Sequence, residues 1–326
     1  MDSAVTTPAP ALDKPLMHYG KRTLDRIAPD MSQPEYRLLD ICPLTPHIGA
    51  EVEGVDLSLP IGEDLAEEIR QALLEWKVLF FRDQHGFDPQ SQLAFSALWG
   101  EPEANPFFPK GDTIGVSRLA KDAMAMGTEN IWHSDHSFMA APALGSVLRA
   151  VEVPSAGGDT MWADMAAAYD NLTESMKARI EGLTAVHDWV PSWGSLMTEA
   201  QLAAHRENLP AVEHPVVVRH PRTGRKLLYV NEPFTTRIVG LSDEESRELL
   251  GELVLQARIP EYQVRFRWQP ASVAIWDNIA TQHYAINDYF PQRRVMERIA
   301  IAGVPLSRTS LPAPFSPPHP VSAEPL

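Results

Sequence analysis

The chain has 326 residues, of which 44% are hydrophobic, enough for the core of one large domain or two small ones. Its formal net charge of −15 argues against a nucleic acid or an anionic membrane surface as the main partner, although local arginines can still bind a small anion. Cys42 is the only cysteine, which excludes an intrachain disulfide and a cysteine-based metal site. We expect a cytoplasmic protein, because no apolar run is long enough to span a membrane and the N-terminus lacks the features of a signal peptide.

The two ends of the chain differ in composition from its middle. Residues 1–34 are rich in Pro, Ala, Thr and Asp and have little periodicity, which predicts a flexible N-terminal arm. Residues 307–326 form a proline-rich tail that is not expected to join a core. One domain over residues 35–306 is expected between them.

Short strands dominate the predicted elements after residue 110. Apolar spacing predicts helices over 64–76 and 88–99, a mostly helical segment over 163–183, and a helix that starts at a capping box at Ser242 and runs to about 257. Strands are predicted over 48–57, 78–81, 113–116, 145–153, 261–268, 271–276 and 293–302, with a hairpin over 213–230. This pattern favours a mainly β fold with helical insertions, a double-sheet jelly roll.

The stretch Ile131–Phe138 carries a possible metal site. In His133-x-Asp135, an imidazole and a carboxylate share one side of an extended strand. Two histidines and one carboxylate cover one face of a metal ion and leave the other open, as in non-haem Fe(II) oxygenases. The candidate third ligand is His283, on a turn after the strand that ends at 276–278. His136 competes, but it points away from Asp135 if the strand continues.

The last predicted strand places Arg294 and Arg298 on one face, about 13 Å apart along the strand. A guanidinium in a pocket suits a planar anion such as a carboxylate. The alternative is a pair of salt bridges with some of the 43 acidic residues. Beside a metal strand we favour two anion anchors, one for a dicarboxylate cosubstrate and one for the substrate.

These motifs resemble the taurine dioxygenase/2,4-D dioxygenase family of Fe(II)- and 2-oxoglutarate-dependent oxygenases, over about residues 38–303. The matching stretches are 132–135, 157–162, 229–238 and 276–298. The resemblance implies a double-stranded β-helix core, 2-oxoglutarate and O₂ as cosubstrates, hydroxylation of a small anionic substrate with release of succinate and CO₂, and a homo-oligomer. It also implies residue roles: iron ligands His133, Asp135 and His283; Thr160 and Arg294 for the distal carboxylate of 2-oxoglutarate; Arg298 for the substrate anion.

Three positions depart from the pattern of taurine dioxygenase. Asn105 stands where that enzyme has a histidine, Phe108 lacks a hydroxyl, and Glu129 stands where a neutral amide is expected. All three are expected to contact the substrate. Taurine itself is therefore disfavoured, and a sulfonate, sulfate ester or carboxylate of larger size is expected. The additional aromatic residues that suggest a larger, apolar substrate, although each also suits a core, are Phe107, Phe108, Trp189 and Trp193.

Two other functions stay open at this point. The same cofactors support desaturation or isonitrile formation, which leave no mark in the ligands, whereas halogenation is disfavoured because Asp135 is present. A jelly-roll binding module without catalysis is the alternative from a different class. It is disfavoured because all five residues for metal and cosubstrate are present.

Overall fold

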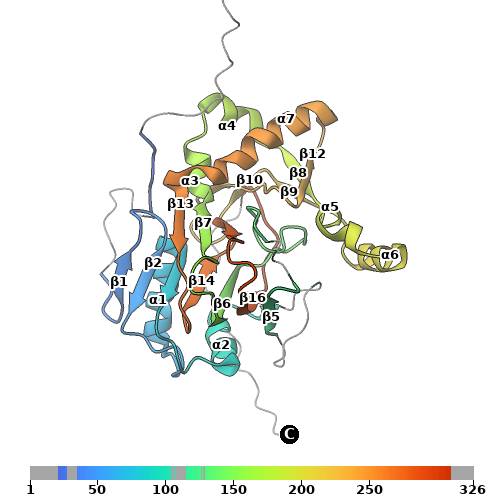
Figure 1. Cartoon of the computed structure of the whole chain (residues 1–326). Coiled ribbons are helices and arrows are strands. Elements are labelled where there is room, and N and C mark those ends of the chain that lie inside the picture. Colours follow the sequence, from blue (N-terminus) through green and yellow to red (C-terminus); the bar gives the residue numbers. More distant parts are fainter. Residues whose placement is uncertain are drawn as a thin grey trace, which may run out of the picture.

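The computed structural model describes residues 21–27, 35–103, 107, 115–125, 127 and 129–309. Its largest sheet, the major sheet, has the order β1-β2-β3-β14-β6-β16-β4, and β5 also pairs with β16 (Figure 1). Its strands are β1 (Asp40–Pro43), β2 (Ala50–Glu53), β3 (Val78–Phe81), β4 (Pro102–Glu103), β5 (Ser117–Lys121), β6 (Gly145–Glu152), β14 (Val273–Asp277) and β16 (Arg294–Ile301).

A smaller sheet, the minor sheet, has the order β13-β7-β15 and faces the major sheet across a shared core. Its strands are β7 (Thr160–Asp164), β13 (Gln263–Phe266) and β15 (Thr281–Ala285). Further strands form the sheet β12-β8-β9 and the hairpin β10-β11. They are β8 (Thr184–His187), β9 (Val212–Pro215), β10 (Val217–Arg219), β11 (Lys226–Leu228) and β12 (Thr235–Ile238). The two facing sheets confirm the predicted jelly-roll core.

Alternation along β14 shows how the sequence builds two layers. Val273 and Ile275 pack in the cluster that includes apolar side chains of helix α1, whereas Ala274 and Trp276 point between the two sheets. Alternate side chains of a strand lie on opposite faces, so an uninterrupted apolar run can serve both sides of a covered sheet. In the inner layer, the rings of Trp276 and Trp162 lie 5.8 Å apart and join the major sheet to the minor sheet.

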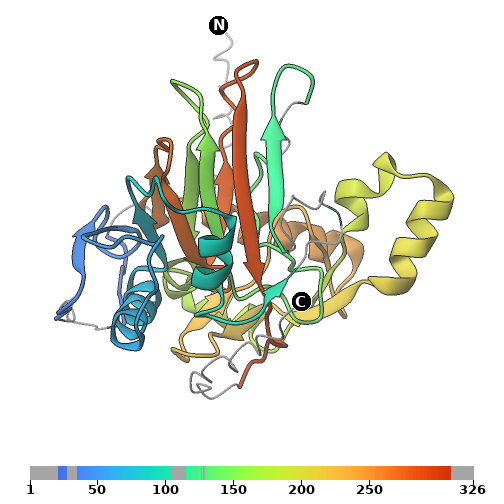
Figure 2. The same cartoon turned by 90° about the horizontal axis from the view of Figure 1, so that it is seen from below.

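Helices cover the outside of the sheets and extend the molecule on one side. In Figure 1, α2 lies at the opposite end from α4 and α7, and Figure 2 shows α5 and α6 projecting from the body. Neither α5 nor α6 has a fully buried residue. The helices are α1 (Glu63–Trp76), α2 (Pro89–Ser96), α3 (Met165–Asp170), α4 (Glu174–Ile180), α5 (Val190–Trp193), α6 (Glu199–Asn208) and α7 (Asp243–Val254), with 3-10 turns η1 (Gly194–Leu196), η2 (Leu255–Arg258) and η3 (Pro260–Tyr262). Among the described helices, none is both long and apolar enough to cross a membrane.

Part of the predicted N-terminal arm packs on the domain. Arg26 and Glu75 are both buried, with Arg26 Nε 3.4 Å from Glu75 Oε1. The side chain of Asn171 accepts a hydrogen bond from the amide of Thr23 and donates one to its carbonyl. Near the other end, Arg308 donates to the carbonyl of Leu183 at 2.9 Å. Residues 1–20, 28–34 and 310–326 lie outside the described part of the chain.

Most predicted elements are found where the pattern placed them. The capping box at Ser242 is formed, with Glu245 as its partner, and α7 follows it. One strand is displaced: it was expected over 113–116, but the described strand begins at Ser117, and residues 113 and 114 lie outside the described chain. The region 184–211 and β12 received no detailed prediction and contain two helices, a 3-10 turn and two strands.

Candidate metal centre

Two predicted metal ligands meet through one pair of backbone hydrogen bonds. His133 N donates to His283 O at 3.1 Å, and His283 N donates to His133 O at 2.8 Å. Directly opposed residues of an antiparallel pair place their side chains on the same face. The two imidazole rings are accordingly 4.1 Å apart, measured between their centroids. The short segment around His133 thus extends the minor sheet beyond β15.

His283 lies on strand β15 and not on a turn, which corrects the sequence-based prediction. The turn between β14 and β15 is short because Asp277 Oδ1 accepts hydrogen bonds from the amides of Ile279 and Ala280, at 3.0 and 2.9 Å. A side-chain oxygen that accepts hydrogen bonds from the amides two and three residues ahead stabilises a tight turn. Strand β15 therefore resumes at Thr281 and carries His283 into register with His133.

The carboxylate of Asp135 completes the cluster from a turn. Asp135 Oδ1 lies 3.8 Å from His133 Nε2, and Asp135 Oδ2 lies 3.8 Å from His283 Nε2. One ligand atom from each of these three residues lies within 4.8 Å of the other two. The predicted strand does not continue through Asp135, because residues 135–138 form a turn. His136 has a φ of 57° and its Nδ1 contacts Glu103 Oε2 at 2.8 Å, so it stays outside the cluster.

Asn278 fixes the backbone of Asp135, a role that the sequence analysis missed. Its Oδ1 accepts from Asp135 N at 2.8 Å, and its Nδ2 donates to Asp135 O at 2.9 Å and to Ala143 O at 2.8 Å. Asn278 is fully buried, and only a primary amide supplies a donor and an acceptor in this arrangement. The one available signal was a polar residue immediately after the buried strand β14.

The charges and tautomers of the cluster fit a divalent metal. His133 Nδ1 lies 2.8 Å from the carbonyl of Ile131, which assigns the ring proton to Nδ1. The lone pair of Nε2 is then available to bind a metal. Burial lowers the pKa of His283 to about 3, so its imidazole is neutral. Burial alone raises the pKa of Asp135, but Arg298 and the two imidazoles more than offset this and hold it well below its usual range. Two imidazoles and one carboxylate are a suitable donor set for iron.

The two arginines of β16 lie at different distances from this cluster. Arg298 is buried and its Nη1 donates to Asp135 Oδ1 at 2.7 Å, so its guanidinium adjoins the metal ligands. Arg294 is also buried; its Nε donates to Gly158 O at 3.2 Å, two residues before Thr160. Thr160 Oγ1 accepts from Trp268 Nε1 at 2.9 Å. The structure therefore places Arg294 against the segment that leads into the strand of Thr160; their shared role at one anion site stays a prediction.

The predicted substrate contacts are only partly described. Asn105 and Phe108 lie outside the described residues. Glu129 is described, and its Oε1 forms an ion pair with Lys121 Nζ at 2.8 Å. Its charge is therefore balanced by a residue that the sequence analysis did not select. Trp189 is fully buried and donates through Nε1 to Leu209 O, so it belongs to the core.

An aromatic wall adjoins the metal ligands. It extends the prediction for Phe107 and Trp193, and its members are Phe107, Phe138, Trp193 and Phe234. The rings of Trp193 and Phe234 are 5.3 Å apart, and the ring of Phe234 is 6.5 Å from that of His133. Phe138 and Phe234 were missed as members of this cluster because the sequence gives no sign of which cluster a single aromatic residue joins.

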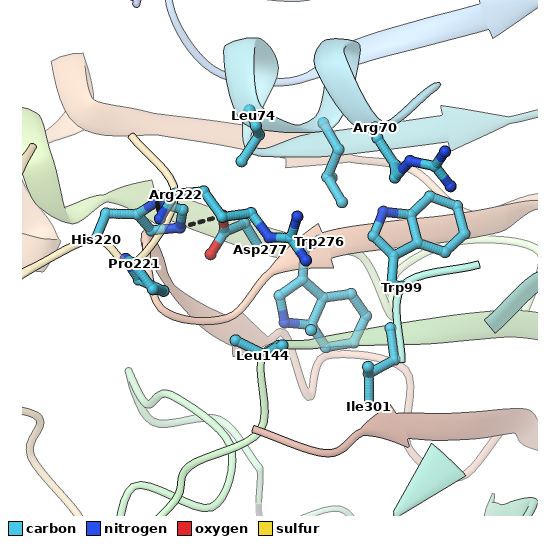
Figure 3. A pocket seen from close by; sticks show the side chains of 12 residues that line it. Arg70, Leu74, Trp99, Leu144, His220, Pro221, Arg222, Trp276, Asp277 and Ile301 are labelled. Atoms are coloured by element: carbon cyan, nitrogen blue, oxygen red, sulfur yellow. Dashed lines mark hydrogen bonds and ion pairs between the residues drawn. The ribbon is translucent and has the colours of Figure 1, made fainter. Parts of the chain in front are cut away.

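A small separate cavity of about 40 Å³ lies between α1, the end of β14 and the turn after β10 (Figure 3). His220 Nε2 lies 2.8 Å from Asp277 Oδ2 at its edge, both side chains buried. Since the other oxygen of Asp277 closes the turn before β15, this pair supports the strand of His283. No metal ligand lines the cavity.

Comparison with known proteins relates this chain to one family of dioxygenases. The family model for "Taurine catabolism dioxygenase TauD, TfdA family" matches residues 40–300. An alpha-ketoglutarate-dependent sulfate ester dioxygenase of Pseudomonas putida is 42% identical over 81% of this chain and 90% of its own length. An alkylsulfatase of Acinetobacter baylyi is 39% identical, over 81% and 85%. An (S)-phenoxypropionate/alpha-ketoglutarate-dioxygenase of Sphingobium herbicidovorans is 35% identical, over 83% and 98%.

Solved structures agree with the fold. A taurine dioxygenase from Burkholderia xenovorans superposes with a TM-score of 0.70 at 37% identity, over 82% of this chain and 90% of that one. The structure of AAD-2 in complex with Mn(II) and N-oxalylglycine gives a TM-score of 0.71 at 32% identity, over 82% and 98%.

Proposed function

Since the chain belongs to the taurine catabolism dioxygenase TauD, TfdA family, we propose that it oxidises an organic sulfate ester at the carbon that bears the sulfate group. The chain is an Fe(II)- and 2-oxoglutarate-dependent dioxygenase. What we propose beyond this reaction class is the substrate, a sulfate ester. It is supported by the names of two relatives and by the anion site beside the metal ligands.

The contact between Arg298 and Asp135 carries this proposal. A buried guanidinium that touches a metal ligand holds a bound anion next to the metal. Arginine binds sulfate-type oxygens through paired N–H groups and keeps its charge when buried. A sulfate ester held there by Arg298 presents the carbon next to its bridging oxygen to the metal.

The other site residues keep the roles that the sequence assigned to them. In this proposal His133, Asp135 and His283 hold Fe(II), while Thr160 and Arg294 hold the distal carboxylate of 2-oxoglutarate. When bound, iron and 2-oxoglutarate supply the activation of O₂ that hydroxylates a C–H bond. The protein orients the substrate carbon, excludes water and fixes the ligands.

The aromatic wall suits the organic part of the substrate. Phe107 and Trp193 are partly exposed, whereas Phe138 and Phe234 are buried, and the ring of Phe234 lies 6.5 Å from that of His133. Burial of alkyl or aryl groups on such surfaces contributes about 0.8 kcal/mol per methylene. A substrate with one anionic end and an alkyl chain of several carbons fits both Arg298 and this wall.

The reaction balances without a further reactant. A primary alkyl sulfate, O₂ and 2-oxoglutarate give the 1-hydroxyalkyl sulfate, succinate and CO₂. The hydroxylated product then loses hydrogen sulfate and becomes the aldehyde. Equal amounts of succinate, aldehyde and sulfate are therefore expected.

A substrate panel tests the proposal. Alkyl sulfates of increasing length, alkyl sulfonates, taurine and phenoxy carboxylates are each incubated with the Fe(II) protein and 2-oxoglutarate, and succinate formation above the substrate-free rate is measured. Strong coupling with alkyl sulfates and weak coupling with taurine are expected. Coupling restricted to sulfonates or carboxylates would contradict the sulfate assignment.

A phenoxy carboxylate is the second candidate. The wall of aromatic rings can stack on an aryl group, and relatives named for phenoxypropionate and 2,4-dichlorophenoxyacetate are 35% and 32% identical. The same panel separates this candidate, because it yields a phenol without sulfate. Product mass separates hydroxylation from desaturation and isonitrile formation.

The homo-oligomer and the cytoplasmic location stay proposals of the sequence analysis. A location in a reducing compartment is supported by the single cysteine, Cys42, which is exposed and unpaired with any other cysteine. Analytical ultracentrifugation of the full chain tests the oligomer, and a monomer at micromolar concentration would contradict it.

A further inference from the structure

Strand β5 places a second cation beside Arg294. The antiparallel register pairs Lys121 directly with Arg294 and Ser117 with Arg298. Directly opposed residues share a face of the sheet, so Lys121 points to the same side of the major sheet as the two arginines. The edge strand β5 thus adds a positive charge to the end of the site that we assign to the distal carboxylate of 2-oxoglutarate.

Glu129 connects this cation to the segment that leads to the metal. Its Oε1 lies 2.8 Å from Lys121 Nζ, and the two side chains are 31% and 23% exposed. The carbonyl of Glu129 accepts from Ala285 N at 3.3 Å, two residues after the ligand His283. The ion pair therefore spans from β5 to the chain beside β15, at the half-exposed rim of the site.

The carboxylate of Glu129 also acts electrostatically on Arg294, the residue that we assign to the distal carboxylate of 2-oxoglutarate. Burial lowers the pKa of Arg294, and the carboxylates of Glu129 and Asp159 oppose this change. The guanidinium of Arg294 also lies over the ring of Tyr289, 5.9 Å from its centroid. Glu129 pairs with Lys121, the residue directly opposite Arg294, so its carboxylate competes with any carboxylate that binds at Arg294.

We propose that the Lys121–Glu129 ion pair sets the affinity of the site for 2-oxoglutarate: Lys121 adds to the attraction that Arg294 exerts on the distal carboxylate, and Glu129 limits it. This inference rests on the proposed role of Arg294. It explains how the site accommodates an acid at position 129, where the resemblance predicts a neutral amide. Without Lys121, the carboxylate of Glu129 repels the cosubstrate, and without Glu129, two cations attract it.

The test is a set of equilibrium binding measurements. 2-Oxoglutarate is titrated into the Fe(II) protein without oxygen, and the charge-transfer absorption band gives the Kd. Glu129→Gln is expected to lower the Kd about three- to tenfold, and Lys121→Met to raise it about three- to tenfold, since both charges are partly screened by water. The double variant K121M/E129Q is expected within about twofold of the wild type, because the two effects offset each other.

A distant ion pair supplies the matched control. Lys177 Nζ and Glu174 Oε1 on α4 are 2.9 Å apart, and the lysine is 22% exposed, much like Lys121. Lys177→Met and Glu174→Gln make the same changes in net charge and are expected to leave the Kd unchanged. Pyruvate, which lacks the distal carboxylate, is expected to respond less than 2-oxoglutarate to both changes at the Lys121–Glu129 pair.

The outcomes separate this inference from the proposed function. Shifts of opposite sign that cancel in the double variant support it. Shifts below twofold, shifts of the same sign, or equal shifts in the control variants overturn it, as does a Glu129→Gln effect confined to the KM of the organic substrate. If wild-type protein does not bind 2-oxoglutarate, both the proposed function and this inference fail; if only the variants fail to respond, the proposed function stands.

Discussion

The metal centre and the aromatic wall lie side by side but are held in different ways. His133 and His283 are fixed by paired backbone hydrogen bonds, and Asp135 by the buried amide of Asn278. The wall, by contrast, is held largely by ring packing, and Trp193 comes from α5, a short helix of the projecting α5–α6 segment. Hydrogen-bonded geometry tolerates few residue types, so the metal centre indicates the reaction. Ring packing tolerates many residue types, so the aromatic wall can differ between enzymes and indicates the substrate.

Loss of a metal ligand is expected to have the largest effect. His283→Ala removes one of three donors and is expected to lower activity by a factor of about 10³ or more and to abolish Fe(II) binding at micromolar metal. Metal titration followed by turnover assays checks this. His85→Ala is the control, because His85 is a largely exposed histidine, and it is expected to match the wild type.

Asn278→Ala removes the support of Asp135 without removing a ligand. The expected result is a 10- to 100-fold weaker affinity for Fe(II), which is typical for loss of a group that orients a metal ligand. The matched control is Gln92→Ala, because Gln92 is fully buried and its amide donates to two backbone carbonyls, at 3.0 Å each, without contact to a metal ligand. Equal losses of metal affinity in both variants would show that Asn278 acts only through general stability.

Trp193→Ala breaks the wall and leaves the metal centre intact. The KM for a long alkyl sulfate is expected to rise about five- to tenfold, in proportion to the apolar area lost, with little change for a short one. Fe(II) affinity is expected to stay at the wild-type value. The exposed Leu196 of the same projecting segment gives the control, Leu196→Ala. A chain-length-independent loss would argue against contact between the wall and the substrate.

The smallest effect is expected from the capping box of α7. Ser242→Ala removes the side-chain oxygen that accepts from Glu245 N and is expected to cost about 1 kcal/mol of unfolding free energy. Chemical denaturation measures this loss. Metal affinity and KM are expected to be unchanged, because α7 lies outside both regions compared above, and a change in either would contradict that separation.

Much of the fold was predictable because local patterns determine it. Alternation and length identified β3, β6 and β16, and the capping box marked the start of α7. The metal ligands were predictable because H-x-D and a later histidine occurred in a recognisable order. The support by Asn278 and the pairing of Lys121 with Glu129 were not, since both depend on contacts between residues far apart in the chain.

Two sequence-based statements were wrong for the same physical reason. His283 was placed on a turn but lies on strand β15, and Asp135 was placed on the strand of His133 but lies on a turn. In both places side-chain hydrogen bonds decide where the strand begins or ends: Asp277 closes the turn before β15, and Asn278 binds the backbone of Asp135. Such bonds carry no periodic signal in the sequence.

The proposed cleavage of a sulfate ester is tested most directly by the ratio of sulfate to succinate formed from a medium-chain alkyl sulfate. The purified chain, loaded with Fe(II) and supplied with 2-oxoglutarate and O₂, is sampled over time and both anions are quantified together with the aldehyde. We expect a ratio near one that holds throughout the reaction, and a loss of sulfate release in Arg298→Leu. Steady succinate formation without sulfate, or sulfate release that does not require 2-oxoglutarate, would contradict it.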